Sequence, residues 1–209
     1  QVDFTKIKNK SLAGADLFSA SFAHSNLSGV NLSDVYLKGT NFWKANLSGQ
    51  DFTVVSDEVI DGSYFVESNL SNSNFEGVSM TPKKIFFVPF KDKAHLINLD
   101  YKDIVEELFG KFNTIKIISM EVQGNDLAVN YVFFSNFVNA NLENANFKNA
   151  GLIYTLLANA NLENANLSGA DLRSANLTGA DLSNADLTGV SINEHTILKC
   201  KNHSICNNS

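Results

Sequence analysis

The chain has 209 residues and a formal net charge of −6, and it contains no run of basic residues. This charge balance argues against a conventional nucleic-acid-binding surface, and the length suits one domain or one domain with an insertion. No apolar stretch is long enough to span a bilayer.

From near the start, leucine or phenylalanine recurs at every fifth residue. A helix would spread this spacing around its surface, and a strand would send successive members to opposite faces. We therefore expect a chain that turns a corner after every unit, with four sides to a coil and coils stacked into a solenoid. The first block contains Leu12, Leu17, Phe22, Leu27, Leu32, Leu37, Phe42, Leu47 and Phe52.

The spacing breaks at residues 53–64 and resumes at Phe65, Leu70, Phe75 and Met80. We interpret 53–64 as a bulge or loop from one corner, with a solvated acidic segment at Asp57, Glu58 and Asp61. Trp43 is an outward aromatic on the first block and a candidate interface residue.

Residues 81–126 do not follow the repeat. An apolar run at 85–90 and alternation within 114–122 predict two strands, and helical spacing predicts a helix around 100–112. Such a β-α-β insertion is too short to bury a good core alone. We therefore expect it to dock on the stack of coils, which we call the rod. The domain plan is thus a first β-helical part at 1–80, an insertion at 81–126, a second part at 127–197 and a tail at 198–209.

The last block repeats most regularly, with a small residue two positions before most leucines. Its central residues are Leu142, Phe147, Leu152, Leu157, Leu162, Leu167, Leu172, Leu177, Leu182 and Leu187. The stretches ANLENANFKNAG and ANLENANLSGADLRSANLTGADLSNADLTGV resemble the pentapeptide repeat family, whose unit is written A(D/N)LXX. The resemblance implies an all-β solenoid, a right-handed quadrilateral β-helix, here with a small α/β insertion.

Apolar residues occupy outward positions after the insertion. Because residues one coil apart stack, Phe133 is expected on Ile153 and Phe134 on Tyr154, with Tyr131 and Leu156 beside them. An exposed apolar patch of this kind marks an interface. We expect the insertion to cover it; the alternative is direct contact with a partner protein.

The two cysteines, Cys200 and Cys206, lie near the C-terminus. A close pair in a tail predicts a disulfide in an oxidising compartment. The two alternatives are reduced thiols and a metal site formed by Cys200, His203 and Cys206, since thiolate and imidazole are soft ligands. The chain begins at Gln1 rather than Met, so we expect that a preceding segment was removed, either a secretion signal or an artificial boundary.

The sequence shows no catalytic constellation: its four histidines are scattered, and no glycine-rich phosphate loop is present. We therefore predict a non-enzymatic interaction scaffold without cofactors, extracytoplasmic rather than cytoplasmic. It would bind a protein partner or associate with itself, for example head to tail, and it would not bind nucleic acid directly. The resemblance raises an alternative, since the quinolone-resistance members of the family mimic DNA and bind DNA gyrase or topoisomerase.

Overall fold

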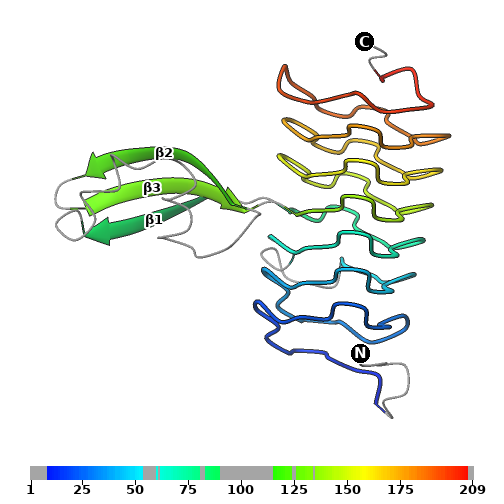
Figure 1. Cartoon of the computed structure of the whole chain (residues 1–209), viewed down its shortest axis with the longest axis horizontal. Coiled ribbons are helices and arrows are strands. Elements are labelled where there is room, and N and C mark those ends of the chain that lie inside the picture. Colours follow the sequence, from blue (N-terminus) through cyan, green and yellow to red (C-terminus); the bar gives the residue numbers. More distant parts are fainter. Residues whose placement is uncertain are drawn as a thin grey trace.

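The structure is a computed structural model. It describes residues 9–53, 60, 62–80, 83–89, 115–123, 126–133 and 135–206. Most of the chain forms a stack of coils that runs from the N-terminal to the C-terminal end, and a small sheet extends from one side of the stack (Figure 1).

Each coil has four sides, and hydrogen bonds join each side to the same side of the next coil. Asn141 forms a parallel bridge with Asn161, 20 residues later. The Leu142 N–H donates to the Asn161 carbonyl at 2.7 Å, and the Asn161 N–H donates to the Ala140 carbonyl at 3.0 Å. The corner that follows is closed by Ala145 N–H on the Leu142 carbonyl. It needs a positive φ, which Asn144 supplies at 57° because asparagine tolerates this region.

The core is a set of columns inside the coils. The central leucines and phenylalanines of the regular coils are buried, and the small residue two positions earlier is buried beside them, as with Ala140 and Leu142. Each coil is too thin to enclose a core, so these side chains lose contact with water only through the coils above and below. Fully burying one leucine contributes about 1.5–3 kcal/mol.

The first interruption adds few residues and keeps the core column filled. Asn46 bonds to Asn69, 23 residues later, instead of the regular 20. Ile60, inside the segment expected to be a loop, is 1% exposed and takes the central position between Phe52 and Phe65. The expectation of a loop over all of 53–64 is therefore wrong at Ile60 and at Ser63, which is also buried. Residues 54–59 and 61, including Asp57, Glu58 and Asp61, lie outside the described residues.

The second interruption, residues 81–134, is called the excursion. It contains a three-stranded antiparallel sheet of order β1-β3-β2. Its strands are β1 (Lys83–Pro89), β2 (Ile115–Gln123) and β3 (Asp126–Phe133). The two predicted strands are present, whereas the helix predicted around 100–112 lies outside the described residues. The strands extend away from the coils (Figure 1), so the expectation that they dock on the rod is wrong for this sheet.

The boundary predicted at 127 is also wrong, because β3 pairs with β1 and β2 rather than with a coil. The coils resume at Asn136, which bridges Tyr64 on one side and Leu156 on the other. At the far end the coils continue past 197, to a bridge between Asp181 and Lys201.

The last coil contains one residue more than a regular coil, because Asn176 bridges Ile197 and not residue 196. Consequently Leu198, 7% exposed, enters the core, while Ile197 is 41% exposed. The sequence phase had placed Ile197 in the inward row.

Candidate interaction surfaces

The corner at which the excursion leaves the rod is well defined. Ser79 bridges Gly151 and Asn136 bridges Leu156, so the residues before and after the excursion stack on one coil. In that coil Tyr154 makes the same turn with a φ of 61°. Ile153, Tyr154 and Leu156 are half-buried. These three predicted interface residues therefore lie beside the base of the excursion.

The other members of the predicted patch are placed differently. Phe133 pairs with Ile115 in β2, so it does not stack on Ile153. Tyr131 pairs with Lys84 of β1 and, on its other side, with β2. The reason is that two antiparallel neighbours complete the backbone hydrogen bonds of this segment, although its apolar residues share the five-residue phase of the coils. Phe134 lies outside the described residues.

Inside the same corner, buried hydroxyl groups donate to carbonyls of the preceding coil at 2.8–2.9 Å. The donor and acceptor pairs are Thr40 with Leu17, Ser63 with Leu37, and Ser135 with Ile60. The next member, Thr155, is fully buried, and its Oγ1 has no hydrogen-bond partner. The carbonyl that corresponds to those of Leu17, Leu37 and Ile60 belongs to Met80, directly before the excursion. This column of hydrogen bonds is thus interrupted where the chain leaves the rod.

Trp43 belongs to a polar cluster that spans three coils. Its indole Nε1 donates to Glu67 Oε1 at 3.3 Å, and Lys44 Nζ lies 4.7 Å from the ring centroid. Lys44 also pairs with Glu67 at 3.3 Å, and the His24 ring meets the indole edge-on at 4.7 Å. The hydrogen bond from Trp43, with help from Lys44, lowers the pKa of Glu67. The indole is therefore held in place by charged neighbours and is half-buried.

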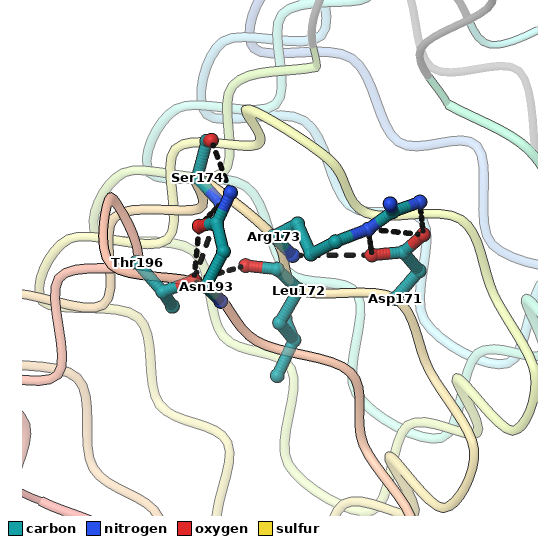
Figure 2. Close-up of polar contacts among 6 residues, drawn as sticks. All are labelled: Asp171, Leu172, Arg173, Ser174, Asn193 and Thr196. Carbon is teal, nitrogen blue, oxygen red and sulfur yellow. Dashed lines mark hydrogen bonds and ion pairs between the residues drawn. The ribbon is translucent and has the colours of Figure 1, made fainter.

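The extra residue in the last coil is accommodated by side chains (Figure 2). In regular coils the N–H at this corner donates to a backbone carbonyl, as Tyr154 does to Arg173. The Ser174 N–H instead donates to Asn193 Oδ1 at 2.9 Å and to Thr196 Oγ1 at 3.2 Å. Two side chains thus replace a backbone acceptor that the extra residue has displaced.

At the C-terminal end, Cys200 and Cys206 form a disulfide. Cys200 is 5% exposed and lies in the core, and Ile205 packs against that core from the tail. The tail therefore covers part of the last coil, as a cap on an open β-helix should.

The sequence model for pentapeptide repeats matches the chain in 8 copies, at residues 3–34, 31–53, 134–156 and 155–193. The chain belongs to the pentapeptide repeat family. Proteins of this family fold as right-handed quadrilateral β-helices, which is the architecture of the coils described above. No curated protein is significantly similar to the chain in sequence.

Solved structures of other pentapeptide repeat proteins are similar at low identity. HetL, involved in heterocyst differentiation regulation in the cyanobacterium Nostoc sp. strain PCC 7120, is 20% identical, with 91% of this chain and 67% of that chain covered and a TM-score of 0.37. QnrB1, a plasmid-mediated fluoroquinolone resistance protein, is 18% identical over 88% and 78% of the two chains, with a TM-score of 0.36. A protein of the Arabidopsis thaliana thylakoid lumen is 18% identical over 69% and 59%, with a TM-score of 0.25.

The metal alternative for the tail of this pentapeptide repeat protein needs free thiolates. In the structure, both thiols of the expected Cys200, His203 and Cys206 set form the disulfide. His203 Nδ1 accepts the Ile205 N–H at 3.2 Å. Within the described ranges, no three His, Cys, Asp or Glu side chains gather as a metal site requires. Among these described residues, no helix is long and apolar enough to cross a membrane.

Sequence reasoning about the repeat missed three features of this pentapeptide repeat protein. Ile60 precedes Phe65 by one regular unit, so its inward position was readable from the spacing. Strand β3 follows β2 after Gly124 and Asn125, a two-residue hairpin signal. The roles of Asn193 and Thr196 had no such signal, because they depend on which corner takes the extra residue.

Proposed function

We propose that this protein is a non-enzymatic scaffold, in which the rod carries the excursion as a recognition element for a protein partner. Pentapeptide repeat proteins are generally structural or interaction proteins. The role of the excursion as the recognition element is supported by the continuity of the rod beneath it. Phe65 and Phe137 stack at 4.8 Å, and Tyr64 bridges Asn136. The rod does not need the excursion in order to stack, so the excursion is free to bind.

The proposed surface consists of the sheet and the coil residues at its base. Ile153, Tyr154 and Leu156 lie beside the corner, and their half-buried side chains offer apolar area next to a projecting sheet. Loops and small elements that a rigid scaffold holds in place are common binding sites. Trp43, fixed by Glu67 and Lys44, is a second candidate contact.

A site-specific photo-crosslinker tests the proposal. We place it at Glu121 of β2, which is exposed, and as a matched control at Thr178, which is exposed on a different corner of the rod. The excursion is supported as the binding site if, in the source cells, the crosslinker at Glu121 reproducibly captures one partner protein and the crosslinker at Thr178 does not capture it. Equal crosslinking from both positions, or crosslinking from Thr178 alone, contradicts it.

We further propose an extracytoplasmic location, and the disulfide supports it, because such bonds persist in oxidising compartments. Non-reducing mass analysis of protein taken directly from the source cells provides the test. A bonded Cys200–Cys206 pair is expected, and a free thiol pair in that sample would support the cytoplasmic alternative.

The DNA-mimic alternative requires a strongly acidic face. One outward column is instead neutral: Asn46, Asn69, Asn141 and Asn161 are joined by side-chain hydrogen bonds of 3.2–3.4 Å. Supercoiling assays with purified gyrase separate the two proposals. We expect no change in rate at micromolar protein, and clear inhibition would favour the mimic.

A further inference from the structure

The C-terminal end of the rod has an incomplete side. In the coil before the last, three backbone groups bind the coil that follows. The Ala165 carbonyl accepts the Asp186 N–H at 2.9 Å, and the Leu167 N–H donates to the Asp186 carbonyl at 2.7 Å. The Gly169 N–H donates to the Thr188 carbonyl at 2.8 Å. These three bonds hold one side of one coil on the next.

The same three groups of the last coil are the Ala185 carbonyl, the Leu187 N–H and the Gly189 N–H. None of them has a backbone partner within the residues that the structure describes. They therefore form a short open strand edge, with one acceptor and two donors at the spacing that a further coil would use.

The edge is open because the disulfide diverts the chain. Lys201 still stacks on Asp181, so the next coil begins on the neighbouring side. Continuation in register would bring residue 206 above Asp186. Instead Cys206 bonds to the buried Cys200, which draws the tail inward across the core.

A groove of about 550 Å³ remains between this edge and the tail. One wall is the open edge and the other is the turn at the end of the tail. Its lining residues are Ala185, Asp186, Leu187, Thr188, His203, Ser204 and Ile205.

We propose that this groove binds an extended peptide segment of a partner protein as one added parallel strand. The peptide would donate one N–H to the Ala185 carbonyl and present carbonyls to the N–H groups of Leu187 and Gly189. A leucine-sized side chain of the peptide would lie over Leu187 and against Ile205, as the central residue of a further coil would. Strand addition of this kind draws affinity from main-chain hydrogen bonds and specificity from alternate side chains. This site is separate from the excursion.

A second copy of the chain is a poorer occupant than a peptide. Stacking a whole coil would need all sides of the end to be open, and the turn from His203 to Cys206 already covers one corner. The groove leaves room along a single side. The proposed ligand is therefore a strand from a partner and not a second rod.

The probe for the test is a synthetic peptide with the sequence of residues 184–190, NADLTGV, acetylated and amidated. This segment already makes the required contacts with the coil below it. On titration, we expect amide NMR shifts confined to 185–189 and 203–205, and at least about tenfold slower hydrogen exchange at Leu187 and Gly189. The amides of Leu167 and Gly169, already bonded within the rod, should not change.

The control is the same peptide with the aspartate nitrogen methylated, which removes the N–H meant for the Ala185 carbonyl without altering the protein. Loss of one such bond lowers affinity by about fivefold or more. The proposal is overturned if the peptide fails to bind at millimolar concentration, if methylation has no effect, or if shifts appear elsewhere. Concentration-dependent dimerisation that protects the same amides would assign the edge to a second copy and would also overturn it.

Discussion

The rings of Phe65 and Phe137 stack 4.8 Å apart, with an angle of 4° between their planes, although the whole excursion separates them in sequence. The column on the opposite side of the coils does the same, since Phe75 and Phe147 stack at 4.7 Å. Edge-to-face contacts such as Phe75 with Phe137 join the two columns. The middle of the rod is therefore held by aromatic rings that the interruptions do not separate.

Replacing Phe137 with alanine should lower the free energy of unfolding by about 3–5 kcal/mol, because Phe137 is fully buried and its loss leaves a cavity. Phe137→Leu should cost less than about 1.5 kcal/mol, since the next member of this column is already Leu157. Urea denaturation measures both. A cost below about 1 kcal/mol for Phe137→Ala would show that the columns are not continuous at the excursion.

Replacing residues 81–134 with the dipeptide Ser-Gly should give a folded rod. This change keeps the five-residue spacing from Met80 to Phe137 and places glycine at the corner where Tyr154 has positive φ in the next coil. We expect thermal unfolding to remain cooperative and the amide NMR spectrum of residues 140–190 to be preserved. Loss of cooperative unfolding would mean that the excursion takes part in holding the coils together.

The Thr196→Val variant removes a hydroxyl that accepts the N–H groups of Ser174 and Asn193. In the unchanged protein, the Thr196 hydroxyl also donates to the Leu172 carbonyl at 3.1 Å. Partly buried polar groups left unpaired cost about 1–3 kcal/mol, and the Ser174 amide should exchange faster. Thr178→Val is the control, because Thr178 is exposed and its hydroxyl, within the described residues, bonds only to the Asn176 side chain. Equal effects of the two variants would contradict the role assigned to Thr196.

The pKa of Asp171 is held below its usual value, mainly by hydrogen bonds from Arg173, whose Nε lies 2.9 Å from the carboxylate. A carboxylate with a lowered pKa stabilises the fold at pH values above its ordinary pKa of about 3.9. This stabilisation is lost as the pH falls through the pKa of the folded state. Arg173→Gln should raise the pKa of Asp171 and leave that of Asp186, which Thr188 lowers, unchanged.

Carbon-13 NMR titration of the two carboxyls measures this effect. The change in stability should be small, because the pair is exposed and screened by solvent. An unshifted Asp171 in the variant would show that the contact with Arg173 does not persist in solution.

Serine at both Cys200 and Cys206 should loosen the end of the rod and not its middle. The bond closes a short loop, and its loss should cost roughly 2 kcal/mol. Because each coil depends on its neighbours, we expect faster hydrogen exchange at Ile197 and Lys201 and no change at Phe42. Uniform acceleration along the chain would contradict this local view.

The repeat was predictable because every unit repeats the same physical choice: one large apolar residue inside, one small residue beside it and a turn residue at the corner. Ala140, Leu142 and Asn144 satisfy all three at once. The excursion was only partly predictable. Val132 has the phase of a coil and the pairing of a strand, and only the partner strand, far away in sequence, decides between them.

The candidate surfaces were the least predictable part. Trp43 was readable as an outward aromatic, but its bond to Glu67 depends on the extra residues between the two coils. The open edge at Leu187 depends on the direction that the disulfide gives to the tail. Both result from small shifts in register that composition does not record.

Ile60 returns to the core column after the extra residues of the first interruption, just as Leu198 does after the single extra residue near the end. The perimeter of a coil thus stretches at its corners without disturbing what is stacked inside. In evolution, such a rod can therefore accept extra residues at a corner, from the one residue of the last coil to the whole excursion, while its core column stays filled. New domains can therefore be inserted at the corners, while the stacked core of the rod stays the same.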